Sequence, residues 1–154
     1  MIEGWYYLHT NGELIYKREL GGTAADIRES DFARAMWPLD TTDREGAWRI
    51  LVESSALGAN PARIQELADK WRCNSEDSEN YAERIGCNLW LDGNMWCAAL
   101  PSFVNLQESP TGFGDTELLA MADLAKTLGF RASKMWGASL KDLLQNIASA
   151  EHAR

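Results

Sequence analysis

The chain has 154 residues, of which 45% are hydrophobic and 25% are charged, and its formal net charge is −8. This length and balance predict one folded domain, or two small ones, and exclude a globally disordered protein. The excess of acids argues against a nucleic-acid partner, because binding to a phosphate backbone relies on Lys and Arg, and it favours a basic protein surface or a neutral ligand.

A β-hairpin is the first element that the sequence predicts. Two runs rich in strand-forming residues, 5–10 and 13–18, flank the pair Asn11-Gly12. Because both residues of a two-residue turn must take a positive φ, this pair is a strong signal for such a turn. A hairpin alone is only marginally stable in water, so at least one of its faces must pack against the rest of the chain.

A two-residue turn would fix which side chains share a face of the hairpin. Leu8 and Ile15 would point to one face, where they could close the core. The other face would carry Trp5, Tyr7, Tyr16 and Arg18. This aromatic face could simply stabilise the hairpin, or it could be a recognition patch, because rigid aromatic side chains and Arg dominate binding hot spots.

Four helices are predicted to follow the hairpin. A short one is expected over 26–37, ending before Pro38. A longer one should begin at the capping box formed by Thr42 and Glu45 and should stop at Gly58. These two helices would start a helical cluster beside the hairpin.

The next two helices resemble a helix-turn-helix in their short connection. Asn60 should cap the first, with Pro61 at its first helical position. An acidic turn after Asn74 should start the second, which Gly86 closes. The second helix carries four acids against one Arg: Glu76, Asp77, Glu79 and Glu83. We expect this charge to repel DNA and interpret these acids as candidate contacts for a protein partner.

The pattern changes after Gly86 from helices to strands. Strands at 88–91 and 95–100 should form a second hairpin around residues 92–94, with apolar residues that imply burial on both faces. A third strand is expected over 103–106. These strands predict a small antiparallel sheet in the second half of the chain.

Polar residues cluster just beyond the predicted third strand, at Asn105, Gln107 and Glu108. An edge strand offers unpaired backbone groups, so a partner peptide could add to the sheet at this place. We therefore interpret these three residues as further candidate contacts.

Gly112 and Gly114 precede the next predicted helix. Glycines between a strand and a helix suggest phosphate binding, but Glu117 takes the place of the third glycine of the dinucleotide fingerprint. We interpret the glycines as turn residues and expect Asp115 or Thr116 to cap the helix.

Two helices complete the prediction, one over about 116–128 and one that begins near Ser139 with Asp142 as its capping partner. The last helix has an apolar stripe from Leu140 to Ala148. This stripe could dock on the core, or it could form a contact between copies of the chain.

The residues offer no catalytic motif. The three cysteines, Cys73, Cys87 and Cys97, lack metal-site spacing, and the chain has only two histidines. We find neither a signal peptide nor an apolar run long enough to cross a bilayer. We therefore expect a non-enzymatic cytoplasmic protein that contacts no membrane and needs no metal or cofactor.

Two stretches resemble known families. "GWYYLHTNGELIYKRE" and "ARAMWPLDTTDREGAWRILVESSALGA" are similar to small proteins encoded by bacteriophages and prophages, over roughly residues 4–72. "DGNMWCAALPSFVNLQESPTGFGDTELLAMADL", residues 92–124, resembles another phage segment and the HicB-type antitoxin fold. That resemblance implies a three-stranded sheet followed by a helix capped by Gly114-Asp115-Thr116, without catalysis.

The sequence thus predicts an α+β protein. Residues 1–86 would form a β-hairpin with a helical cluster, and residues 87–154 a three-stranded antiparallel sheet with one or two packed helices, in a HicB-like βββα arrangement; the two parts could share one core. The resemblance implies a phage accessory protein that binds a host protein, for instance to inhibit a defence or nucleic-acid-processing complex. The alternative is a nucleic-acid or nucleotide binder that stacks bases on Trp5, Tyr7 and Tyr16.

Overall fold

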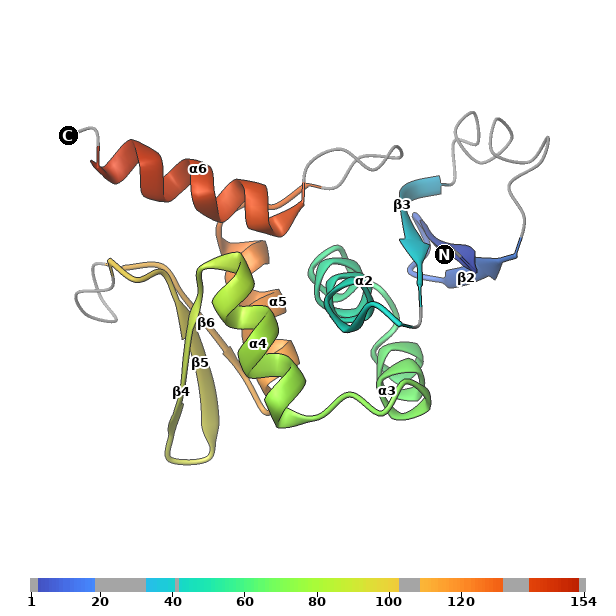
Figure 1. Cartoon of the computed structure of the whole chain (residues 1–154), viewed down its shortest axis with the longest axis horizontal. Coiled ribbons are helices and arrows are strands. Elements are labelled where there is room, and N and C mark those ends of the chain that lie inside the picture. The colour runs from blue at the N-terminus through green and yellow to red at the C-terminus, as the bar shows by residue number, and fades with distance from the viewer. Residues whose placement is uncertain (1–2, 19–32, 41, 103–108, 132–138, 153–154) are drawn as a thin grey trace.

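The computed structural model describes five stretches of the chain (Figure 1): residues 3–18, 33–40, 42–102, 109–131 and 139–152. Within them the chain forms two three-stranded antiparallel sheets and five helices, which confirms the predicted α+β class. The predicted strand over 103–106 and the polar cluster of Asn105, Gln107 and Glu108 lie outside the described residues.

The N-terminal sheet contains the two strands of the predicted hairpin and a third strand. The three strands are β1 (Gly4–His9), β2 (Leu14–Lys17) and β3 (Ala33–Leu39), arranged in the order β2-β1-β3. β1 therefore lies in the centre and pairs antiparallel with both neighbours.

β3 shows that the helix predicted over 26–37 is wrong in the part that the structure describes. Ala35, Trp37 and Leu39 belong to the main core cluster, whereas Met36 belongs to a separate cluster on the other face. Side chains that alternate between two faces are the mark of a strand. This period of two overrides the helical spacing on which the prediction depended.

The first hairpin is confirmed, but its predicted register is wrong by one residue. A two-residue turn at Asn11-Gly12 would place Tyr7 opposite Tyr16, whereas in the structure Tyr7 pairs with Ile15. The loop has three residues instead of two, because His9 N donates to Glu13 O at 2.9 Å. Gly12 ends this loop with a φ of +91°, as the three-residue hairpin loop requires.

The helical cluster forms largely as predicted. It consists of α2 (Arg44–Ala56), α3 (Pro61–Lys70) and α4 (Ser75–Ile85). The predicted capping box at the start of α2 is wrong: α2 follows Asp43, while the backbone N–H and the hydroxyl of Thr42 both donate to the Asp40 carboxylate, at 2.9 and 2.6 Å.

Local signals set the ends of α3 and α4. Asn60 caps α3 by accepting from Ala62 N at 2.9 Å, and Asn74 caps α4 by accepting from Asp77 N at 2.9 Å. Gly86 ends α4 in the left-handed conformation. These three residues act as the sequence predicts.

The loop of the first hairpin docks on the connection between α2 and α3. Gly12 O accepts from Asn60 N at 2.9 Å, and a Cβ atom on Gly12 would lie 3.0 Å from Gly58 O. We attribute the three-residue loop to this contact, which the hairpin sequence alone does not reveal.

The second sheet has the order β4-β5-β6, with β4 (Asn88–Asp92), β5 (Met95–Ala99) and β6 (Thr111–Gly114). The prediction that 111–114 is a loop and turn is wrong. Its glycines face the next helix, α5 (Glu117–Thr127), where a Cβ on Gly112 would collide with the backbone of that helix. They allow a close strand–helix approach rather than a turn.

The two C-terminal helices begin as predicted. Thr116 caps α5 by accepting from Leu119 N at 3.2 Å. α6 (Leu140–His152) starts with the capping box, in which Ser139 and Asp142 bond each other's backbone N–H. On the apolar stripe of α6, Leu140 and Leu144 are buried in the main core cluster, so this part of the stripe docks on the chain itself.

One core cluster joins the two halves of the chain. α2 contacts β3 on one side and α4 and α5 on the other (Figure 1). The cluster includes apolar residues from both sides of Gly86: Leu8, Leu51, Leu67, Met121 and Leu144. The N-terminal sheet and the C-terminal layer therefore pack on the same central helix.

A buried carboxylate, Glu53, links three elements within this core. It accepts hydrogen bonds from Trp37 Nε1 of β3 at 3.0 Å, from Arg49 Nε of α2 at 3.1 Å and from Leu140 N of α6 at 3.0 Å. Burial raises the pKa of Glu53 although these donors oppose the rise. Its removal would leave donors of β3 and α6 without an acceptor.

Candidate protein-binding surface

The structure does not bring the predicted hairpin patch together on one exposed face. Trp5 and Tyr7 are only 6% and 8% exposed and pack with Met36 and Ile15. The one-residue shift in register places Tyr16 on the opposite face, so the predicted grouping is wrong.

Tyr16 and Arg18 are the exposed members of that predicted patch. The ring of Tyr16 packs against that of Tyr6 in a tilted arrangement, with ring centroids 5.2 Å apart, and its hydroxyl donates to Glu3 O at 2.9 Å. Two exposed residues on β2 and just beyond it form a much smaller surface than the predicted four.

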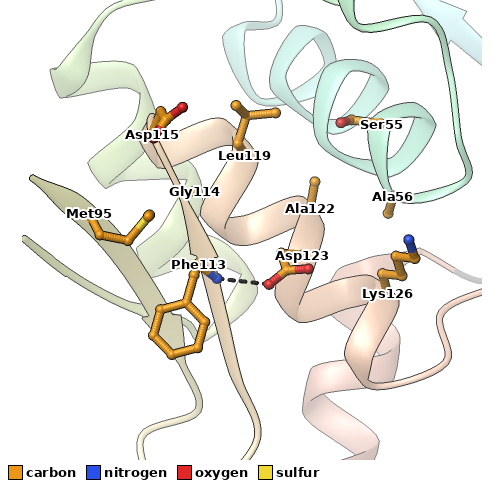
Figure 2. A pocket seen from close by; sticks show the side chains of 10 residues that line it. All are labelled: Ser55, Ala56, Met95, Phe113, Gly114, Asp115, Leu119, Ala122, Asp123 and Lys126. Atoms are coloured by element: carbon orange, nitrogen blue, oxygen red, sulfur yellow. Dashed lines mark hydrogen bonds between the residues drawn. The ribbon is translucent and has the colours of Figure 1, made fainter.

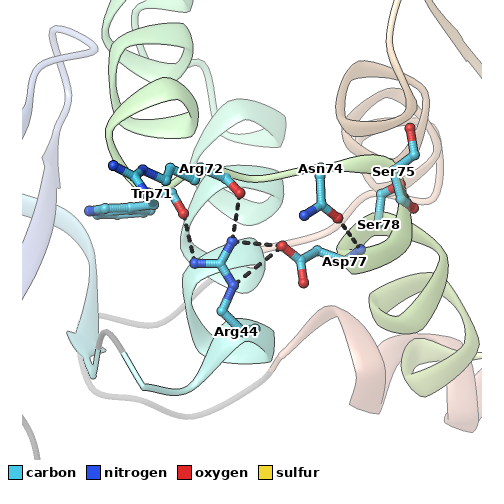
Figure 3. Close-up of polar contacts among 7 residues, drawn as sticks. All are labelled: Arg44, Trp71, Arg72, Asn74, Ser75, Asp77 and Ser78. Carbon is cyan, nitrogen blue, oxygen red and sulfur yellow. Dashed lines mark hydrogen bonds and ion pairs between the residues drawn. The ribbon is translucent and has the colours of Figure 1, made fainter.

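The acids of α4 divide into three exposed residues, Glu76, Glu79 and Glu83, and one engaged residue, Asp77. Asp77 Oδ2 lies 2.6 Å from Nη2 of Arg44 (Figure 3). This hydrogen bond raises the pKa of Arg44. Asp77 therefore contributes to the internal structure, while the other three acids face solvent.

Arg44 connects the starts of α2 and α4 with the end of α3. Its guanidinium also donates to Trp71 O at 2.6 Å and to Arg72 O at 2.9 Å (Figure 3). Carbonyl groups at the end of a helix have no partner within the helix, so a cation satisfies them well. Arg72 itself has a φ of +52°, an uncommon value for a residue with a side chain.

The largest exposed apolar side chains lie mostly around the second sheet. Exposed fractions there are 54% for Leu91, 41% for Met95, 43% for Phe113 and 39% for Leu119. The predicted burial of both faces of the second hairpin is therefore wrong beside its turn, at Leu91 and Met95, but three successive residues of β5 are buried: Cys97, Ala98 and Ala99. Exposed apolar residues that gather in one place often mark a surface that binds a partner.

An open groove borders β6, and we call it the β6 groove (Figure 2). It has a volume of about 440 Å³ and lies between β6 and α2, with α5 as its floor. Ten residues line it: Ser55, Ala56, Met95, Phe113, Gly114, Asp115, Leu119, Ala122, Asp123 and Lys126. The groove combines three of the exposed apolar residues with charged residues of α5.

Among the residues that the structure describes, β5 is the only strand that pairs with β6, so β6 forms one edge of the described sheet. Phe113 N donates to the Asp123 carboxylate at 2.9 Å (Figure 2). A side chain of α5 therefore already accepts the hydrogen bond of a backbone N–H of β6 at the groove. Edge strands with such donors are where other chains can pair.

Sequence reasoning did not identify the β6 groove. The predicted contacts do not include Phe113, Leu119, Asp123 or Lys126. They do include three residues that depend on the same feature, an open sheet edge: Asn105, Gln107 and Glu108. One local signal could have revealed β6: a large side chain, Phe113, between two glycines fits a strand whose small side packs against a helix.

A second, larger cavity of about 860 Å³ lies between α2, α4 and α6. Its charged lining residues have both signs, with Arg44, Arg84 and Lys141 against Asp43, Glu45, Asp77 and Glu83. A lining with charges of both signs does not select ligands of either charge, and Arg44 and Asp77 already bind each other.

The cysteines are held in the thiol form. Burial raises the pKa of Cys87 to about 12 and also raises that of Cys73 and Cys97. A protonated thiol is a poor nucleophile and a poor metal ligand. Among the described residues no group of three or more His, Cys, Asp or Glu side chains could hold a metal ion.

Among the helices that the structure describes, none has the length and apolar character needed to cross a bilayer. Comparisons with protein-family models, with curated proteins and with solved structures found no match to this chain.

Proposed function

We propose that this protein is a non-enzymatic binding module that takes up an extended segment of a protein partner along the edge of β6. The observation that carries this proposal is the β6 groove, where an edge strand borders exposed apolar side chains. Strand addition gains affinity from backbone hydrogen bonds and specificity from pockets for alternate side chains.

The side chains around β6 suit the second part of that mode of binding, the recognition of partner side chains. Phe113 and Met95 lie on the sheet side of the groove and Leu119 on its helical floor, so a partner strand would have apolar surface to cover. Rigid aromatic side chains such as Phe113 are common anchors of interfaces. The resemblance to small phage-encoded proteins favours a bacterial host protein as the partner, bound in the cytoplasm, and inhibition of a host complex as the outcome.

The stacking of bases on the hairpin has weaker support. Trp5 and Tyr7 would have to leave a buried cluster before they could stack on a base. The net charge of −8 also opposes binding to a phosphate backbone.

The test compares three baits in a pull-down from bacterial lysate: the wild-type chain, Phe113→Ser and Tyr16→Ser. Tyr16 is the matched control, because it is an aromatic residue of similar exposure, 40% against 43%, on the other sheet. We expect the same proteins to be retained by wild type and Tyr16→Ser and to be lost with Phe113→Ser. Equal retention by all three baits, or loss with Tyr16→Ser alone, would contradict the proposal.

A further inference from the structure

We propose that Asp123 closes the edge of β6 in the free protein, and that the β6 groove selects partner segments with a Lys or Arg that pairs with Asp123 when it is displaced. This inference rests on the proposed function and names the chemistry of its partner. It is based on the contact between the Asp123 side chain on α5 and the backbone of Phe113 on β6.

The Asp123 carboxylate occupies a position that a partner strand needs. Its Oδ2 atom accepts from Phe113 N at 2.9 Å, as the carbonyl of an added strand would. A hydrogen bond to a charged acceptor is stronger than one between neutral groups. Strand addition at Phe113 therefore requires that this carboxylate moves aside.

A displaced Asp123 would need a new partner. Its side chain is partly buried in the groove, and covering it with a peptide would remove more water from the charge. A buried carboxylate is costly unless it is paired. A cation on the incoming segment would supply that pairing at the place where the carboxylate is released.

The charges of the groove favour a basic segment. Among the described residues that line it, Asp115 and Asp123 stand against one cation, Lys126, and the whole chain carries −8. Lys126 lies three residues after Asp123 on the same helix, so it could itself approach the displaced carboxylate. We therefore expect Lys126→Gln to strengthen the preference for a basic partner.

The experiment begins with a display library of random linear peptides selected on the folded wild-type chain. Peptides that shift the amide NMR signal of Phe113 are kept as groove binders. Each is then made in two forms, with its Lys or Arg retained or replaced by Gln. Both forms are titrated against the wild type, Asp123→Asn, Asp123→Ala and the charge-matched control Glu79→Gln, which changes an exposed residue outside the groove.

We expect the groove binders to be enriched in Lys and Arg. Replacement by Gln should weaken binding to wild type about fivefold, the effect of about 1 kcal/mol for a partly exposed ion pair. Asp123→Asn keeps an acceptor for Phe113 N but removes the charge, so it should abolish this difference. Asp123→Ala opens the edge and should bind the Gln form more tightly than wild type does, whereas Glu79→Gln should behave as wild type.

Two results would overturn the inference in different ways. Groove binders without Lys or Arg enrichment, or with no loss on Gln replacement, would refute the role of Asp123 and leave the proposed function standing. Selected peptides that shift signals elsewhere but not that of Phe113 would refute both. Because the Gln replacement is made in the peptide, the first result does not depend on the folding of any Asp123 variant.

Discussion

Glu53→Ala should cost this protein about 4 kcal/mol of its free energy of unfolding. Trp37 Nε1 and Leu140 N would lose their common acceptor, and each buried donor left without a partner costs about 1–3 kcal/mol. The third donor, Arg49, has a side chain that is 27% exposed and can turn to water. Since a domain of this size is stable by only about 5–15 kcal/mol, the loss would be large.

Glu53→Gln separates the hydrogen bonds from the charge. Gln keeps the shape and one acceptor oxygen but cannot serve donors on both sides, so it should cost less than Ala, about 1–2 kcal/mol. The raised pKa of Glu53 sets the pH dependence. Its folded-state pKa lies above the ordinary value of 4.5, so the protonated form is favoured by folding and stability is lost as the pH rises from 4.5 to the folded-state pKa.

Urea unfolding of wild type and Glu53→Gln, followed by tryptophan fluorescence over a series of pH values, measures this effect. The difference between the two proteins cancels the titration of every group that they share. Wild type should gain stability relative to Glu53→Gln as the pH falls through the folded-state pKa toward 4.5. A difference that does not change with pH, or that changes in the opposite direction, would refute the assignment of Glu53 as a carboxylate destabilised by burial.

Three further predictions concern single residues. Gly112→Ala should lower the free energy of unfolding by about 3 kcal/mol, because its Cβ would meet the α5 backbone, and an unchanged urea midpoint would contradict this packing. Arg72→Gly should add about 1 kcal/mol to the free energy of unfolding and so raise the melting temperature, because glycine adopts a φ of +52° without strain and the backbone carbonyl that Arg44 binds is kept. A lower melting temperature would show that the Arg72 side chain stabilises the fold. Cys87 should resist thiol labelling at neutral pH until urea unfolds the chain, since its pKa is about 12 in the folded state, and rapid labelling of the native protein would contradict its burial.

The sequence predicts best the elements whose ends are set by local chemistry. Asn60, Asn74 and Gly86 each satisfy backbone groups within a few residues, and the helices that they bound form as expected. The errors occur where distant residues decide. The hairpin loop lengthens where Gly12 meets Asn60, which is a contact that no local pattern contains.

The same reason explains why the β6 groove is difficult to predict. Gly112 and Gly114 indicate a turn locally, and only the packing of α5 shows that they permit close approach. The groove then combines residues as distant as Ser55 and Lys126, which the fold brings together. Exposed apolar residues such as Phe113 look like core residues until their surroundings are known.

Backbone amide hydrogen exchange of the whole chain, with and without a bound partner segment, tests the central claim most directly. Binding along the β6 edge should slow exchange at Phe113 and leave the first hairpin, residues 4–17, unchanged. Protection confined to that hairpin or to the acidic face of α4, with none at Phe113, would contradict the account.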